Sequence, residues 1–228
     1  MAGRWSRLSG PTARFAAVDW QRWHNEYDRP GSGLARRLSA VQGQVRAALD
    51  RAPAGAVRVI SLCAGQGRDV LDVMAGHPRR ADVRARLVEL DPRLSSFAEE
   101  RARQLGLQDQ VEVVTGDAAL IDQYGGMVPA DMVLVCGVFG NISDEDIAAT
   151  IDTCPQLCET GATLIWTRHR GEPDLVPQIC EWFEARGFER VWVSDPDAGF
   201  GVGVHRFTGE PQPLIPGRTL FSFVSGGV

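Results

Sequence analysis

The loop at residues 64–67, Ala-Gly-Gln-Gly, contains residue types suited to binding an anionic or polar ligand. It follows an apolar, β-branched run at 57–63, which predicts a buried parallel strand, and it precedes helical spacing that begins at Arg68. A glycine turn between a strand and a helix N-terminus points backbone N–H groups at such a ligand. Glu89 closes a second strand 22 residues after this loop, where a carboxylate binds ribose hydroxyls in nucleotide-binding folds. The pattern therefore predicts a nucleoside cofactor.

Two later strands end in segments that fit the same site. The strand expected at 111–114 opens into an acid-containing turn at 115–118, and the apolar strand expected at 131–136 opens into a glycine-containing loop at 137–141. Sheets of α/β proteins place their ligands at these carboxyl ends of strands. A nicotinamide fingerprint requires a third glycine, and Val70 stands at that position. The loop therefore disfavours a nicotinamide dinucleotide.

These four pieces, in this order and spacing, resemble class I S-adenosylmethionine-dependent methyltransferases over residues 57 to about 207. The resemblance implies S-adenosyl-L-methionine as the cofactor. Its methionine part would lie over the glycine loop and beside the loop after the fourth strand. Its ribose would lie on Glu89, and its adenine against Leu90 and the turn at 115–118. The residues so assigned are Tyr27, Cys63, Ala64, Gly65, Gly67, Glu89, Leu90, Gly116, Asp117, Ala118, Cys136, Gly137 and Asn141.

Each assignment has a structural alternative. The two loop glycines would suit any tight turn, and Glu89 would also fit as a solvated acid at a strand end. Asp117 would equally serve as the N-cap of a following helix. Cys63 stands where the family often has Gly or Asp. This difference puts in doubt the contacts of the loop with the carboxylate of the cofactor's methionine part. Cys63 and Cys136 also fit as small apolar fillers.

Alternating strand and helix patterns predict a doubly wound α/β fold with a seven-stranded, mostly parallel sheet. The last two strands have no helix between them, which predicts a C-terminal antiparallel hairpin. We expect residues 1–54 to form an N-terminal helical cap or lid, and residues 55–228 to form a Rossmann-like catalytic domain. A Pro-rich arm at 209–216 should lead to a short strand at 219–224. The expected strands are 57–63, 84–90, 111–114, 131–136, 160–167, 188–193 and 200–207, and the expected helices after the cap are 67–76, 93–105, 117–124, 144–157 and 174–186.

Methyl transfer from a sulfonium is an in-line displacement in which the cofactor brings its own reactivity. A general base is needed only where the acceptor must lose a proton. His169, at the end of the fifth expected strand, is the best-placed candidate for a base or substrate contact. His24 would belong to a helical lid with Trp20, Trp23 and Tyr27, although aromatic residues at this spacing more often form core.

The composition of the chain limits the kinds of binding partner and chemistry that it supports. The chain has 228 residues and a net charge of −5, which argues against a nucleic-acid surface. It contains no Lys, which excludes Schiff-base chemistry. Five Cys without a disulfide framework predict reduced thiols in a cytoplasmic protein, and Cys154 and Cys158 lack the further ligands of a metal site. No segment is apolar enough to span a membrane. A small-molecule acceptor is favoured, and exposed sheet edges leave a homodimer open.

The favoured function is methyl transfer to an oxygen or nitrogen atom of a small molecule. Three alternatives remain: an enzyme of the same fold that uses the cofactor for a non-methyl transfer or a cyclisation, a nicotinamide-dependent oxidoreductase, and a protein that binds the cofactor without turnover.

Overall fold

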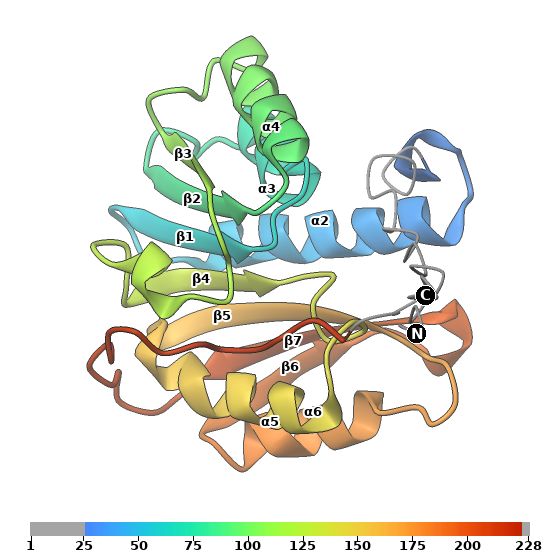
Figure 1. Ribbon diagram of the computed structural model, residues 1–228. Coiled ribbons are helices and arrows are strands. Elements are labelled where there is room, and N and C mark those ends of the chain that lie inside the picture. Colours follow the sequence, from blue (N-terminus) through green and yellow to red (C-terminus); the bar gives the residue numbers. More distant parts are fainter. Residues whose placement is uncertain (1–25, 225–228) are drawn as a thin grey trace, which may run out of the picture.

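One seven-stranded sheet forms the centre of the protein, for which a computed structural model describes residues 26–224 (Figure 1). The strand order is β3-β2-β1-β4-β5-β7-β6, and β7 alone runs antiparallel to its neighbours, pairing with β5 and β6. The predicted sheet and its terminal hairpin are therefore confirmed. The strands are β1 (Val57–Leu62), β2 (Val83–Glu89), β3 (Val111–Thr115), β4 (Ala130–Val135), β5 (Cys158–His169), β6 (Phe188–Val193) and β7 (Phe200–Phe207).

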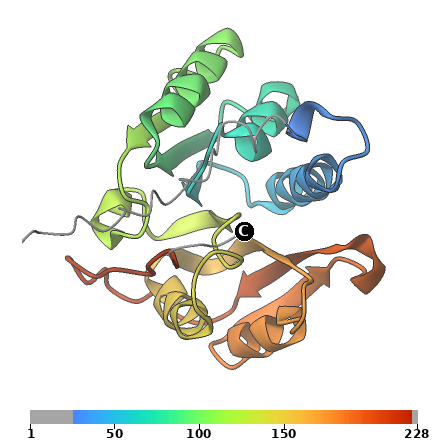
Figure 2. The same ribbon diagram turned by 45° about the vertical axis from the view of Figure 1, so that its right-hand side comes forward.

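Helices cover both faces of the sheet, as the doubly wound pattern requires (Figure 2). On one face, α2, α3 and α4 enclose a core with β1 and β2, and α2 continues across to Val202 and Val204 of β7. On the other face, α5 and α6 bury their apolar sides against β4 and β5. The helices are α2 (Gly33–Arg51), α3 (Arg68–Gly76), α4 (Pro92–Gln104), α5 (Asp144–Thr153) and α6 (Val176–Glu184), with 3₁₀ turns η1 (Glu26–Asp28), η2 (Ile121–Tyr124), η3 (Cys154–Gln156) and η4 (Pro196–Ala198).

Side-chain caps explain where α2 and α5 begin. Ser32 accepts a hydrogen bond from the Ala35 N–H at 3.0 Å at the start of α2, and Ser143 accepts one from Asp146 N–H at 3.1 Å at the start of α5. The α2 helix lies within the range expected for the cap, and the division of the chain into a cap and a catalytic domain stays a prediction. The part of the expected cap at residues 1–25 lies outside the described residues.

Three predicted elements differ from the observed ones. The helix expected at 117–124 is only the 3₁₀ turn η2, because Asp117 caps a turn and Gly125 and Gly126 follow. The helix expected at 144–157 ends at Thr153, where Pro155 ends the regular helical hydrogen bonding. The strand expected at 219–224 forms only two isolated bridges.

The segment at 208–224, here called the C-terminal strap, returns across the α5 side of the molecule (Figure 1). Leu220 and Phe221 are buried in the core of that face. The Thr150 hydroxyl donates to the Leu220 carbonyl at 2.9 Å, and the Ser222 N–H donates to Asp146 Oδ2 at 2.9 Å. The strap therefore brings its last residues to the carboxyl edge of the central strands.

Candidate functional site

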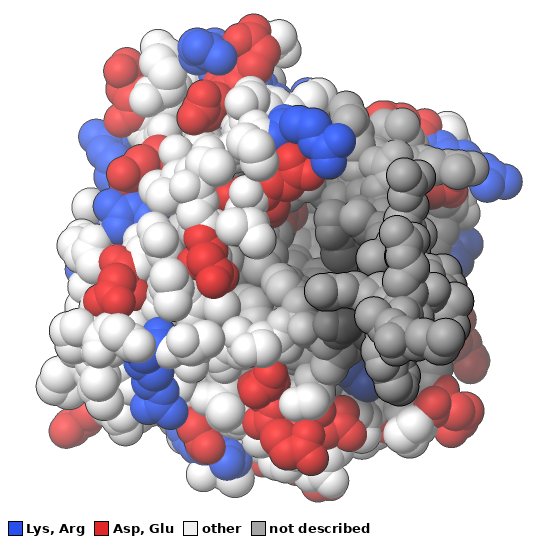
Figure 3. Space-filling view, in the orientation of Figure 1, with Lys and Arg blue, Asp and Glu red and all other residues white. Residues whose placement is uncertain are grey.

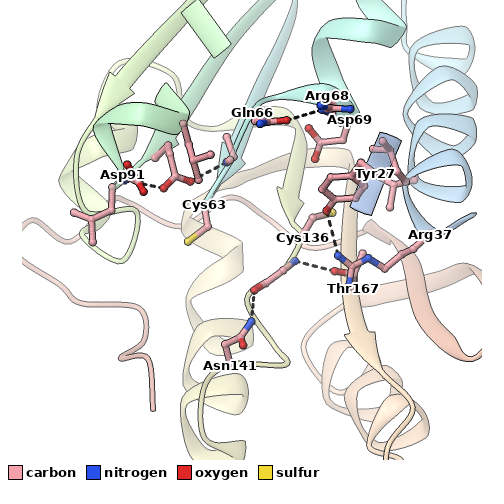
Figure 4. Close-up of a pocket in the computed structure, with 18 of the residues that line it drawn as sticks. Tyr27, Arg37, Cys63, Gln66, Arg68, Asp69, Asp91, Cys136, Asn141 and Thr167 are labelled. Atoms are coloured by element: carbon pink, nitrogen blue, oxygen red, sulfur yellow. Dashed lines mark hydrogen bonds between the residues drawn. The ribbon is translucent and has the colours of Figure 1, made fainter. Parts of the chain in front are cut away.

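A cavity of about 710 Å³ opens at the carboxyl ends of β1, β2 and β4, and this size suits a small organic ligand (Figure 4). Its walls come from η1, α2, the loops after these strands, β5 and the C-terminal strap. Four of the predicted cofactor residues, Gly67, Gly116, Asp117 and Ala118, are not part of its lining. The predicted residues that do line it are Tyr27, Cys63, Ala64, Gly65, Glu89, Leu90, Cys136, Gly137 and Asn141.

The loop after β1 takes a left-handed backbone conformation at three positions. The φ angles of Cys63, Gly65 and Gly67 are 50°, 56° and 68°, and Cys63 is the one non-glycine residue of the described chain with a positive φ. Cys63 thus occupies a position that favours glycine, as the family pattern implies. A Cβ on Gly67 would lie 2.8 Å from Leu87 Cδ1, so glycine lets α3 pack closely against β2.

Glu89 is buried and held in place at the end of β2. Its Oε2 accepts a hydrogen bond from the Gly65 N–H at 2.8 Å, and its Oε1 accepts one from the Asp91 N–H at 2.8 Å. Each carboxylate oxygen has two lone pairs, so both retain a site for a hydroxyl donor. The carboxylate therefore fixes the glycine loop and retains the capacity to bind a pair of vicinal hydroxyls.

The loop after β4 is fixed from two sides. Thr167 Oγ1 accepts a hydrogen bond from the Gly137 N–H at 2.8 Å, and Asn141 Nδ2 donates to the Gly137 carbonyl at 2.8 Å. The Val224 N–H of the strap donates to the Asn141 carbonyl at 3.0 Å. Phe223 and Val224 also line the cavity, and sequence reasoning did not assign them to the site.

Two further cavity residues, Arg37 and Asp69, also escaped prediction. Asp69 lies in the first turn of α3, where its Oδ1 accepts a hydrogen bond from the Val70 N–H at 3.0 Å. Burial raises the pKa of the Asp69 carboxyl to about 6, against the lowering effects of backbone N–H groups and of Arg37. Arg37 Nη2 donates to the Tyr27 hydroxyl at 3.3 Å. Asp69 follows the glycine loop by two residues, which was the available signal; Arg37 gave none.

Arg68 joins three parts of the chain at the cavity wall. Its Nη1 lies 2.5 Å from Asp28 Oδ1 of η1, and its Nε donates to Gln66 Oε1 at 2.6 Å. The guanidinium carbon also lies 5.9 Å from the centre of the Tyr27 ring and 5.8 Å from that of Phe97 on α4. Arg68 thereby links η1 to the glycine loop.

Both cysteines of the cavity are protonated thiols. Burial raises the pKa of Cys63 and of Cys136 well above the ordinary value, and neighbouring acids raise them further. Neither thiol is therefore a nucleophile at neutral pH, in keeping with their alternative assignment as small apolar fillers.

Asp117 and His169 are not part of the cavity lining. Asp117 is exposed, and its Oδ1 accepts from the Ala119 N–H at 2.9 Å within a turn. It is not the helix N-cap considered above, because only the 3₁₀ turn η2 follows and Leu120 is the N-cap of that turn. His169 is exposed at the end of β5, and its Nδ1 accepts from the Gly171 N–H at 3.0 Å. Its neutral ring then carries the proton on Nε2. Desolvation, with Arg168, lowers the pKa of His169. His24 lies outside the described residues.

Within residues 26–224 there is no group of three or more His, Cys, Asp or Glu side chains arranged to bind a metal ion. None of the helices in this range has both the length and the apolar character needed to cross a bilayer.

Three similar proteins give the chain its context. The uncharacterized protein YnbC of Escherichia coli (strain K12) is 27% identical over 148 residues, 63% of this chain, which spans only 25% of the length of YnbC. The structure of an O-methyltransferase family protein from Burkholderia thailandensis has a TM-score of 0.62 at 17% identity, over 86% of this chain and 62% of that one. Magnesium protoporphyrin IX methyltransferase (ChlM) from Synechocystis PCC 6803, with bound SAM, has a TM-score of 0.62 at 16% identity, over 85% of this chain and 93% of that one.

The fold shared with these structures is that of class I methyltransferases, and together with the family match it supports S-adenosylmethionine as the cofactor. Residues 31–183 match the model of a family described as "Putative methyltransferase". This match covers more than half of the chain, from α2 to α6, and includes the glycine loop and Glu89. The chain therefore belongs to this methyltransferase family.

Proposed function

We propose that this protein transfers the methyl group of S-adenosylmethionine to an oxygen or nitrogen nucleophile of a small molecule. The observation that carries the proposal is the glycine loop held by Glu89 at the mouth of a cavity of about 710 Å³. The donor set fits the cofactor, because it combines a carboxylate for a ribose with backbone groups and apolar walls. The sulfonium supplies an activated methyl group when bound.

The cavity residues would hold the cofactor in distinct roles. Glu89 would accept hydrogen bonds from the ribose hydroxyls, and Leu90, which is 63% exposed, would contact the adenine. The loop at 63–67 and the Cys136–Gly137 turn would hold the methionine part. The adenine contacts predicted for Asp117 and Ala118 stay a prediction, because these residues are outside the cavity lining.

Catalysis rests mainly on alignment of nucleophile, methyl group and sulfur. Such orientation contributes about 7–11 kcal/mol to lowering a barrier. Thr167 and Asn141 fix the loop beside the transferred methyl group, and the apolar side chains of Leu38, Val41 and Phe223 exclude water. His169 as a general base stays a prediction that requires its ring to release the Gly171 N–H.

A small-molecule acceptor agrees with the surface and with the named neighbour. On the face drawn in Figure 3, acidic and basic side chains of the described residues are interspersed, with no continuous basic patch. Nucleic-acid binding normally depends on such a patch. ChlM, by its name, acts on a porphyrin, which is a small molecule.

Product analysis with the full chain tests the proposal. The protein is incubated with S-adenosylmethionine and a library of small alcohols, phenols, acids and amines, and products are followed by mass spectrometry. We expect S-adenosylhomocysteine to accumulate only with certain acceptors, together with an acceptor heavier by one methyl group. Methylthioadenosine instead would indicate cyclisation of the aminobutyryl arm. Tight binding without any product would indicate a cofactor-binding protein, and binding of NADH would revive the oxidoreductase.

A further inference from the structure

An acidic and a basic side chain, Asp69 and Arg37, both line the cavity on the side that Figure 4 draws opposite Asp91. Figure 4 shows Asp69 pointing from the start of α3 toward Tyr27, while Arg37 extends from α2 toward Thr167 and Cys136. All five residues line the cavity. In the proposed function the adenosine would bind at Glu89 and Leu90, next to Asp91, so this charged side of the cavity would face the opposite part of the cofactor.

That part of the cofactor is an amino acid with one ammonium and one carboxylate group. The loop at 63–67, which lies beneath it, contains no acidic side chain. Of the acids that line the cavity, Glu89 is assigned to the ribose in the proposed function, and Asp91 is paired with the Arg93 guanidinium at 2.8 Å. Asp69 remains as the carboxylate positioned for the ammonium.

We propose that Asp69 and Arg37 form the subsite for the amino-acid end of the cofactor, with Asp69 accepting hydrogen bonds from the ammonium and Arg37 donating to the carboxylate. The inference rests on the proposed function, since it assumes that S-adenosylmethionine occupies this cavity. A guanidinium has five N–H donors in a planar fork, so Arg37 donates to a carboxylate while keeping its bond to Tyr27.

The electrostatics of Asp69 agree with a cationic ligand. Burial at this wall disfavours the charged form of the Asp69 carboxyl, and an ammonium group of the ligand would stabilise that charged form. The charged or titratable groups that act on Asp69 are Arg37 from α2, Tyr27 from η1, Cys136 after β4 and Asp72 on its own helix. Burial raises the pKa of both Tyr27 and Cys136, so these two stay neutral near pH 7.

Two ligands separate this subsite from the rest of the cavity. S-adenosylhomocysteine and 5′-methylthioadenosine share the adenosine and the thioether sulfur, and only the former has the ammonium and carboxylate. Calorimetric titration of Asp69→Asn and Arg37→Gln at pH 7.5 should show affinity for S-adenosylhomocysteine reduced by about 10- to 100-fold. Affinity for methylthioadenosine should stay within about threefold. Arg36→Gln, at the exposed neighbouring position, should change neither affinity.

A pH series provides a second readout. The affinity of the wild-type chain for S-adenosylhomocysteine should fall as the pH drops from 7.5 to 5, because Asp69 takes up a proton while the ligand ammonium stays charged. Affinity for methylthioadenosine should show no such fall, and Asp69→Asn should remove it for S-adenosylhomocysteine.

The proposed subsite would be wrong if the variants lost affinity for both ligands equally, or if they bound S-adenosylhomocysteine as tightly as the wild type does. Wild-type protein that binds neither ligand would overturn the proposed function as well. A wild type that binds both, with variants that do not discriminate between them, would overturn the subsite alone.

Discussion

Two carboxylates in the same cavity have opposite local environments. Glu89 receives a backbone N–H on each oxygen, which compensates for its burial. Asp69 receives the Val70 N–H at its own turn of helix, and its burial leaves the charged form disfavoured. Glu89 therefore fixes the glycine loop while each of its oxygens keeps a lone pair for a hydroxyl, and Asp69 is the acid whose charged form a cationic ligand would stabilise.

Replacing Glu89 tests both of its roles. Glu89→Ala leaves the N–H groups of Gly65 and Asp91 without their acceptor and removes the ribose ligand. We expect the affinity for S-adenosylmethionine to fall by at least about tenfold and the free energy of unfolding to drop by about 1–3 kcal/mol. Calorimetry and urea denaturation measure the two effects. Glu99→Ala, at an exposed position of α4, is the control. A loss of affinity under about threefold would show the ribose assignment to be wrong.

Replacing Asp69 should stabilise the cofactor-free protein. Its folded-state pKa of about 6 exceeds the ordinary 3.8, so ionisation at neutral pH opposes folding. Asp69→Asn keeps an oxygen for the Val70 N–H, and we expect it to raise the free energy of unfolding at pH 7.5 by about 1–3 kcal/mol. The gain should shrink as the pH falls from 6 toward 4, where the wild-type carboxyl is protonated. Urea denaturation at both ends of this range measures it, and a net destabilisation at pH 7.5 would contradict it.

Site residues could be predicted from the sequence where one short strand–turn–helix pattern is enough to bring them together. The glycine loop and Glu89 belong to adjacent strands, and strand–turn–helix spacing alone brings them together. Arg37, Thr167 and Phe223 reach the cavity from α2, β5 and the strap. Their sequence positions hold no local signal, because only the assembled sheet places them side by side.

At the scale of elements, the C-terminal strap departs most from its sequence pattern. Its apolar run at 219–224 predicted a short strand, yet it pairs only through single bridges to Leu120 and Ile142. Side-chain bonds from Thr150 and Asp146 hold it in place of a ladder. Contacts of this kind, between residues distant in the chain, leave no periodic pattern in the sequence. The helices α2 and α3 follow helical periodicity and were therefore predictable.

Two phenylalanines of the strap should separate packing from binding. Phe221 is 3% exposed in the core, and Phe223 is 47% exposed at the cavity. We expect Phe221→Ala to lower the free energy of unfolding by about 3–5 kcal/mol. Phe223→Ala should change it by less than about 1 kcal/mol while weakening binding of S-adenosylhomocysteine or of the acceptor by about 3- to 30-fold. Denaturation and calorimetry on both variants give the comparison. Unchanged binding of every ligand by Phe223→Ala would exclude the strap from the site.

At the scale of the whole molecule, the sheet carries a separate core on each face, and burial there disfavours the charged form of an unpaired titratable group. His205 on β7 is fully buried, and its ring stacks 4.7 Å from that of Phe183. Trp166 Nε1 donates to His205 Nδ1 at 3.1 Å, which places the ring proton on Nε2. Burial, with Arg190 nearby, lowers the pKa of His205 to about 3. Sequence reasoning gave the strand but not this stack, because three distant elements build it.

This buried histidine should make the fold sensitive to mild acid. Its unfolded-state pKa is 6.5, so its contribution is fully present above that value and is lost as the pH falls from 6.5 toward 3. Between pH 7 and pH 5 we expect the titration of His205 to lower the free energy of unfolding by about 2 kcal/mol. Asp69 acts in the opposite direction over the same range, so the test compares variants rather than the wild type alone. His205→Asn keeps an acceptor for the Trp166 N–H without titrating, and its stability should fall less than that of the wild type by this amount. Equal losses in the two proteins, measured by urea denaturation at both pH values, would show that another group controls acid sensitivity.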